Sequence, residues 1–211
     1  MRILSVSKYK GSTYETELDD GRKIYLHADI IADFAVHSDM ELDQTELRKI
    51  IYASNFRRGY QYALHLLDYR DYSYKEMLEK LVKTYKNENL CIKIMKRLTE
   101  HGFIDDERYA ERLARKYIES KRYGERRVRS EMMRKGLDKF VITDAIAQYD
   151  ELFEENLDWL LENKHSRNLQ DKNDRKSVEK VKCALVRYGY SFGEINEAVF
   201  RYFEELEAQE E

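Results

Sequence analysis

The feature that most constrains this fold is an internal repeat of about fifty residues. At an offset of 53 residues, apolar and glycine positions coincide in six pairs: Val128 with Val181, Met132 with Leu185, Gly136 with Gly189, Ile142 with Ile195, Ala145 with Ala198 and Tyr149 with Tyr202. At an offset of 51, an earlier segment matches in the same way: Met77 with Val128, Leu81 with Met132, Ile94 with Ala145, Met95 with Ile146 and Leu98 with Tyr149. Periods of this length indicate stacked helical repeats. The sequence therefore predicts three tandem copies of one unit.

Cap chemistry divides each copy into three short helices. Ser73 with Glu76 and Ser191 with Glu194 have the spacing of capping boxes. Three glycines, at 102, 136 and 189, suit the left-handed residue that ends a helix. We expect a mainly α fold, an elongated curved solenoid, with helical repeats at 46–104 (including a lead-in helix), 105–151 and 152–211. In the third repeat, residues 163–176 should form a long, mobile link between the first two helices.

The first 45 residues have a different pattern. Segments 2–7, 13–18 and 23–27 contain β-branched and alternating residues, and Asp19, Asp20 and Gly21 provide a turn. We predict a small β-hairpin or sheet as an N-terminal head at 1–45. A sheet of this size is marginal alone, so it should pack on a helix at 28–36.

Composition narrows the class of protein. The chain has 211 residues with 37% charged residues and no proline, and no stretch approaches the roughly 20 apolar residues of a membrane span. We expect a cytoplasmic monomer. The cysteines at 91 and 183 lie in amphipathic helical patterns, which favours two buried thiols over a disulfide or metal site.

Reactive groups do not converge in the sequence. The five histidines, at 27, 37, 65, 101 and 165, lie far apart, and the sequence contains no zinc-protease motif, nucleophile elbow or phosphate-binding loop. Asp105 and Asp106 could form a metal or general-base pair, but carboxylates at a helix start favour capping. We expect a protein that binds rather than catalyses, with no cofactor.

Charge is distributed unevenly along the chain. Residues 115–135 contain nine basic residues and three glutamates, a net charge of +6, whereas residues 194–211 have a net charge of −6. On a helix that begins after Gly124, an inward stripe should contain Val128, Met132 and Met133, leaving outward five basic residues: Arg126, Arg127, Arg129, Arg134 and Lys135. Such a face suits phosphates, an acidic protein groove or plain solvation, and the residues alone do not separate these.

Tyrosines are interleaved with these basic residues, which raises the alternative of base stacking. Tyr109 and Tyr117 share one helical face with Leu113, so we place both in the core with their hydroxyls at the rim. Tyr123, beside the glycine turn, should be exposed enough to contact a partner.

Three motifs resemble the RecX family, regulators of the bacterial RecA recombinase. They are Tyr69-Arg70-Asp71-Tyr72-Ser73 followed by Glu76, then Gly102-Phe103-Ile104-Asp105-Asp106-Glu107-Arg108-Tyr109-Ala110, and Arg126 to Leu137. The resemblance covers about residues 60–150, and the rest agrees in repeat layout. It implies a non-enzymatic protein of three-helix repeats that engages the RecA–DNA filament and limits ATP hydrolysis and strand exchange, in the context of the SOS response.

Two groups of site residues follow. The expected contacts to RecA or to single- or double-stranded DNA are Lys121, Arg122, Tyr123, Arg126, Arg127, Arg129, Arg134 and Lys135. The motif residues with mainly structural roles are Arg70, Ser73, Glu76, Gly102, Asp105, Asp106, Tyr109, Ala110, Gly124 and Gly136. A stand-alone helical DNA-binding regulator and a purely structural scaffold remain the alternatives; the first predicts sequence-specific duplex binding without RecA, and the second predicts neither interaction.

Overall fold

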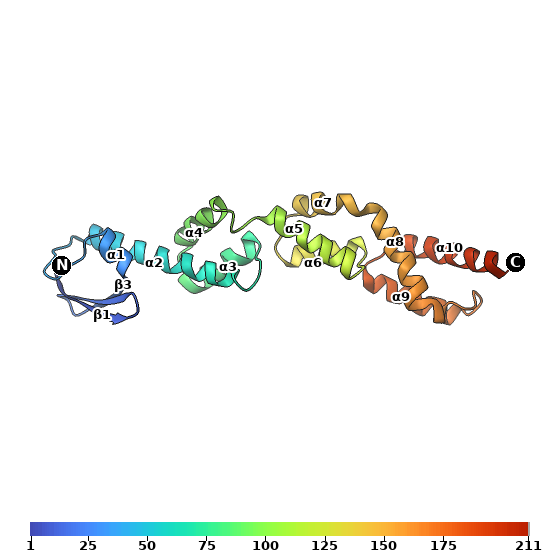
Figure 1. The fold of residues 1–211 in the computed structure, drawn as a ribbon, viewed down its shortest axis with the longest axis horizontal. Coiled ribbons are helices and arrows are strands. Elements are labelled where there is room, and N and C mark those ends of the chain that lie inside the picture. The colour runs from blue at the N-terminus through green and yellow to red at the C-terminus, as the bar shows by residue number, and fades with distance from the viewer. Residues whose placement is uncertain (211) are drawn as a thin grey trace. The chain divides into compact units, whose positions relative to one another are not determined.

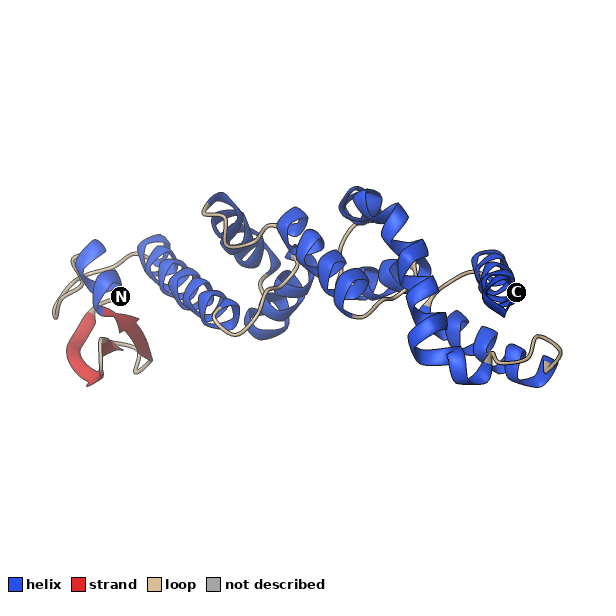
Figure 2. Ribbon diagram, turned by 45° about the vertical axis from the view of Figure 1, so that its right-hand side comes forward, coloured by secondary structure: helices blue, strands red, loops and turns tan. Residues whose placement is uncertain are grey.

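A computed structural model describes the backbone of residues 1–210 and the side chains of residues 1–208. A three-stranded sheet precedes a series of helices (Figure 2), which confirms the mainly α fold with a small N-terminal sheet. The chain divides into two compact units, which can be followed by residue number in Figure 1. Unit 1 contains Met1–Arg70 and Met77–Phe103; unit 2 contains Asp71–Glu76 and the chain from Ile104 on. The predicted solenoid and its four-part division remain predictions. Glu210 and Glu211, at the end of the predicted acidic window, lie outside the described side chains.

The sheet is antiparallel with strand order β1-β2-β3. Its strands are Ile3–Lys10, Thr13–Leu18 and Lys23–His27. β1 extends beyond the predicted residue 7 because it pairs with β2 as far as Lys10 opposite Thr13. Strand side chains Ile3, Leu18 and Leu26 share one buried cluster with Ile30 of the short helix α1, Ala28–Asp33. The sheet therefore packs on this helix, as predicted.

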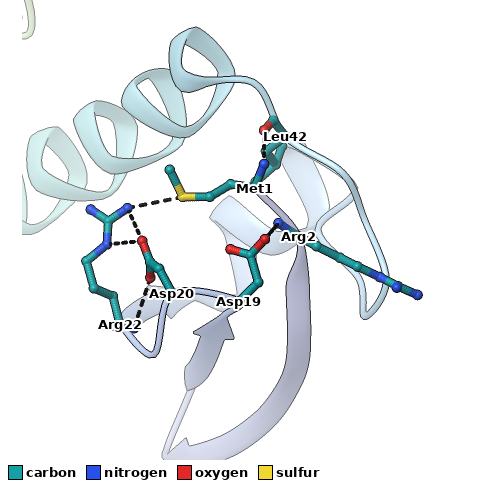
Figure 3. A network of polar contacts seen from close by, with 6 residues as sticks. All are labelled: Met1, Arg2, Asp19, Asp20, Arg22 and Leu42. Carbon is teal, nitrogen blue, oxygen red and sulfur yellow. Dashed lines mark hydrogen bonds and ion pairs between the residues drawn. The ribbon is translucent and has the colours of Figure 1, made fainter.

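Hydrogen bonds of charged side chains stabilise the turn between β2 and β3 (Figure 3). Asp19 accepts a hydrogen bond from the backbone N–H of Arg2 at 2.9 Å, and Asp20 accepts one from Arg22 Nε at 2.7 Å. The terminal amino group of Met1 donates to the Leu42 carbonyl at 3.1 Å. The side chains of Asp19, Asp20 and Arg22 are exposed, so their contacts add little stability and mainly fix the turn.

Three longer helices follow along the chain: α2, Gln44–Leu67; α3, Tyr74–Tyr85; and α4, Glu88–Glu100. Asp43 begins α2 by accepting hydrogen bonds from the N–H groups of Thr45 and Glu46 at 2.6 and 2.7 Å. Glu46 accepts one in return from the Asp43 N–H at 2.9 Å, completing a capping box. Helix α4 contacts α2 and buries an apolar face that contains Leu90, Cys91, Ile94, Met95 and Leu98.

The middle of the chain forms three helices in unit 2. α5, Asp106–Arg115, continues as a π-helical turn at Lys116–Ser120. α6, Glu125–Arg134, and α7, Lys139–Ile146, follow, and a 3₁₀ turn at Ala147–Tyr149 ends the series. All three helices contribute to one buried cluster. Tyr109 and Tyr117 belong to it, which confirms their predicted core position.

The C-terminal part of unit 2 contains α8, Asp150–Leu160; α9, Arg175–Tyr188; and α10, Phe192–Glu210. The predicted long link at 163–176 is shorter than expected. Helical turns at Leu161–His165 and Ser166–Asn168 continue α8, and irregular chain is confined to 169–174. Leu169 is fully buried in the local core, and this apolar anchor holds the chain close to the helices.

Positions paired by the repeat have matching environments. Val128 and Val181 are both buried, as are Ile142 and Ile195. The glycines at 136 and 189 end their helices with φ of +80° and +102°, the left-handed conformation that glycine adopts without steric penalty. The repeat therefore reflects equivalent core and terminal positions.

The two cysteines differ in environment. Cys91 is buried, as predicted, whereas Cys183 is exposed, so the prediction for Cys183 is wrong. Val181 and Leu185 define the inward face of α9, and a residue two positions from both lies about 200° around the helix. Among residues 1–210, the structure contains no helix whose length and hydropathy suit a bilayer crossing.

Candidate functional site

The candidate site is the basic segment, defined as residues 121–135, which forms the turn before α6 and α6 itself. Val128 and Met132 are fully buried, as the helical phase predicts. Met133 is 52% exposed, so its predicted inward position is wrong. Val128 and Met132 are one turn apart, and the next residue is rotated by about 100° out of that stripe.

A cluster of rings and cations surrounds Tyr123. The rings of Tyr123 and Tyr117 are stacked, with centroids 6.0 Å apart, and Tyr188 meets Tyr123 edge-on at 6.1 Å. The Arg127 guanidinium lies 3.8 Å from the centroid of the Tyr123 ring, and Lys121 Nζ lies 5.5 Å from it. Tyr123 is half-buried, because its ring is covered from several sides, and its contact with a partner stays a prediction.

Arg122 points into unit 2. It has a φ of +53°, and its guanidinium donates a 2.5 Å hydrogen bond to the Oδ1 atom of Asn156. The same guanidinium lies 4.0 Å from the centroid of the Trp159 ring. Asn156 is fully buried and also donates to the Ile118 carbonyl at 3.0 Å, while Tyr190 donates to the Arg122 carbonyl at 3.1 Å. These contacts give Arg122 a structural role.

Arg127 joins the start of α6 to the end of α9. Its Nη1 donates to the Arg187 carbonyl at 2.7 Å, which satisfies a free carbonyl near the end of that helix. The N–H of Gly124 donates to the Tyr188 carbonyl at 2.9 Å. A Cβ at Gly124 would lie 2.6 Å from backbone atoms of Gly189, so only glycine permits this approach.

The remaining cations of the basic segment differ in pairing. Arg129 pairs with Glu125 at 2.7 Å, Arg134 pairs with Glu131, and Lys135 lies 3.8 Å from Glu76. Each such pair is worth at most about 1 kcal/mol when exposed to solvent. Among the described side chains, the exposed Lys121 and Arg126 have no carboxylate within ion-pair distance. These two charges are the most available to a partner.

The motif residues hold the segment 71–76 against the middle helices. Ser73 is fully buried; its hydroxyl donates to the Lys135 carbonyl at 2.5 Å and accepts from the Glu76 N–H at 3.2 Å. The Asp106 carboxylate accepts from the Tyr74 N–H at 2.8 Å. A Cβ on Gly136 would lie 3.0 Å from the Ser73 hydroxyl oxygen. The segment therefore docks through groups from all three motifs.

The adjacent aspartates have separate structural tasks. Asp105 caps α5 by accepting from the Arg108 N–H at 2.9 Å, as predicted. Burial raises the pKa of the Asp106 carboxyl, although the hydrogen bond from Tyr74 lowers it.

Tyr109 and Ala110 are buried in the core, and Gly102 has a φ of +70° after α4. Arg70 is exposed. Across residues 1–210, no three His, Cys, Asp or Glu side chains are arranged to hold a metal ion.

Sequence reasoning missed several residues of this site. Asn156, Trp159, Lys164 and Tyr188 come from the C-terminal part of unit 2, where Lys164 donates to the Tyr188 hydroxyl at 2.9 Å. One signal was available: a polar asparagine within the apolar stripe of α8 marks a buried hydrogen-bonding group. The other three residues have no such signal, because their roles depend on contacts with residues distant in sequence within unit 2.

Comparisons with known proteins agree with this organisation. A family model for the second three-helix domain of RecX matches residues 105–146, which span α5 to α7. The regulatory protein RecX of Streptococcus thermophilus (strain CNRZ 1066) is 29% identical over 212 residues, covering 100% of this chain and 80% of the relative.

Two solved structures share the fold. A crystal structure of regulatory protein RecX has a TM-score of 0.71 at 23% identity, covering 95% of this chain and 98% of the other. The crystal structure of RecX from Lactobacillus salivarius has a TM-score of 0.64 at 27% identity, covering 71% of this chain and 97% of the other. Together with the motifs that dock segment 71–76, these comparisons show that the chain is similar to proteins of the RecX family.

Proposed function

We propose that this chain is a regulator that binds the RecA filament on DNA and mainly inhibits its ATP hydrolysis and strand exchange during recombination and repair in the bacterial cytoplasm. The similarity to RecX proteins supports RecA as the partner. The observation that carries the proposal is the pair of unpaired cations, Lys121 and Arg126, within the matched second domain.

The basic segment contributes in two ways. Lys121 and Arg126 project to solvent and would contact acidic protein groups or phosphates. Arg129, Arg134 and Lys135 could join them by replacing their weak surface ion pairs with contacts to the partner. Arg122 and Arg127, together with Tyr123, shape this surface through their contacts in unit 2. Complementary charge at such a surface mainly speeds association and selects the partner.

The experiment is RecA-catalysed ATP hydrolysis on single-stranded DNA with increasing amounts of this chain. We expect inhibition by the wild-type chain and a several-fold higher half-inhibitory concentration for the Lys121→Glu, Arg126→Glu double variant. A matched control reverses two exposed cations of α9, Arg175→Glu and Lys180→Glu, and should inhibit like wild type. Absence of wild-type inhibition at stoichiometric amounts would refute the proposal; equal inhibition by both double variants would place the contact elsewhere.

Direct contact with DNA is a second part of the proposal. If Lys121 and Arg126 met phosphates, log affinity would fall with log salt by about 0.7 to 0.9 per contact. Co-sedimentation of the chain with RecA filaments at several salt concentrations measures this slope, and the double variant should lower it. Sequence-specific duplex binding without RecA would instead support a stand-alone DNA-binding regulator.

A further inference from the structure

Unit 1 contains a groove of about 570 Å³ between α1, α2 and α4. Helix α2 lines it with three aromatic side chains one turn apart, Tyr52, Phe56 and Tyr60. Helix α4 lines it with Lys93 and Arg97, also one turn apart. Residues four positions apart share one face of a helix, so a row of rings on α2 faces a row of cations on α4.

The cations lie over the rings. Lys93 Nζ is 5.3 Å from the centroid of the Tyr52 ring, and the Arg97 guanidinium is 5.9 Å from that of Phe56 and 5.6 Å from that of Tyr60. The planes of Phe56 and Tyr60 differ by only 8°, with centroids 6.4 Å apart. The Tyr60 hydroxyl is 3.1 Å from Nδ1 of His101, which holds the last ring of the row in place.

The groove also has unpaired positive charge. Its Asp29 carboxylate is already paired with Arg57 at 2.8 Å, and Asp33 is the other acidic residue in its lining. Lys93 and Arg97 are exposed, and among the described side chains neither lies within ion-pair distance of a carboxylate. An anionic ligand can therefore approach both cations at the mouth of the groove.

We propose that this groove binds single-stranded nucleic acid, with bases against the α2 rings and phosphates at Lys93 and Arg97. Rings and cations side by side are the combination that binds single strands without sequence preference, because every base has a π-face and every nucleotide a phosphate. An acidic protein segment would use the cations but not the near-parallel rings. The inference goes beyond the proposed function, because it places a binding site in unit 1 and needs no RecA.

Fluorescence anisotropy of a labelled 15-nucleotide oligothymidylate with the full chain tests this proposal. Tyr52→Ala should weaken binding on the order of tenfold through lost stacking, with an unchanged salt slope. Lys93→Gln should lower the slope of log affinity against log salt by about 0.7, the value expected for one phosphate contact on a single strand. The two variants thus separate stacking from charge.

Matched controls come from exposed positions of unit 1 outside the groove lining, Tyr69→Ala and Lys83→Gln, and both should bind like wild type. Three results would overturn the proposal: no binding of the oligonucleotide at low salt, equal binding of an abasic strand of the same length, or equal loss in groove and control variants. Displacement of the strand by polyglutamate at matched charge would also overturn it, in favour of an acidic protein partner. The Tyr52→Ala variant should still inhibit RecA ATP hydrolysis as wild type does. Loss of inhibition in this variant would overturn the claim that the groove and the RecA-binding surface are different sites.

Discussion

The guanidinium of Arg122 lies 4.0 Å from the centroid of the Trp159 ring, so a residue in the turn before α6 contacts helix α8. The same group donates to Oδ1 of the buried Asn156 at 2.5 Å. A planar, permanently charged group can stack and hydrogen-bond at once, which a lysine ammonium cannot do in the same geometry. This contact couples the basic segment to α8.

We expect Arg122→Lys to lower the free energy of unfolding by about 1–3 kcal/mol, because it leaves the buried Asn156 oxygen without its donor. Urea denaturation followed by circular dichroism measures the change. The control is Arg126→Lys at an exposed position, which should stay within about 0.5 kcal/mol of wild type. Equal stability of the two variants would contradict the structural role of Arg122.

Gly124 provides a test of the close approach between α6 and α9. In Gly124→Ala the new Cβ would meet backbone atoms of Gly189 and Tyr190 at 2.6 Å, and such overpacking costs about 1–3 kcal/mol. Gly193→Ala is the matched control, since its nearest neighbour is the Ser191 hydroxyl oxygen at 3.9 Å. Thermal unfolding should show a lower melting temperature for the first variant only. An unaffected Gly124→Ala chain would show that the helices can separate without cost.

Asp106 should make stability depend on pH. Burial raises the pKa of its carboxyl in the folded chain, so the folded state takes up a proton at higher pH than the unfolded state. The ionised carboxylate therefore lowers the free energy of unfolding at neutral pH. This penalty disappears as pH falls through the folded pKa and the carboxyl takes up its proton. Asp106→Asn keeps an acceptor for the Tyr74 N–H and should remove this pH-dependent component. Asp106→Ala leaves that N–H without its acceptor and should lose about 1–3 kcal/mol.

Urea titrations of wild type, Asp106→Asn and Asp106→Ala at pH 7 and pH 4.5 compare these effects. The free energy of unfolding of wild type, relative to that of Asp106→Asn, should be higher at pH 4.5 than at pH 7. If the Asn and Ala variants were equally unstable at pH 7, the hydrogen bond to Tyr74 would have no energetic role.

The two thiols should differ in reactivity. Cys183 is exposed, whereas Cys91 is buried among the apolar side chains of α4, and burial raises the pKa of its thiol. Because the thiolate is the reactive form, a disulfide reagent at pH 8 should modify one thiol of the folded chain quickly and the second only in denaturant. Cys183→Ser should abolish the fast reaction. A fast reaction that persists in this variant would mean that α4 opens readily.

Much of the fold follows from local pattern. The capping box at Ser191 and Glu194 forms as its spacing predicts, with hydrogen bonds of 2.5 and 3.3 Å. Helix caps, turn glycines and the alternation of the strands involve residues close in sequence, so the chain itself specifies them. The repeat offset also identified equivalent buried positions such as Val128 and Val181.

The candidate site follows from local pattern only in part. Helical phase separates Val128 and Met132 from the arginines of α6, but it does not distinguish the exposed Arg126 from Arg127, which binds the Arg187 carbonyl 60 positions away. A helical period describes only which side of a helix a residue occupies. It contains no information on which neighbouring helix covers that side.

The sequence by itself thus determined the repeated pattern of buried positions, the helix caps and the motifs, because these depend on interactions within a turn or two of helix. Only the tertiary structure decided that Arg122 packs on Trp159 while Lys121 and Arg126 face solvent, and that Lys93 of α4 covers Tyr52 of α2. The physical reason is that a side chain's availability depends on desolvation and hydrogen bonding by residues distant in sequence.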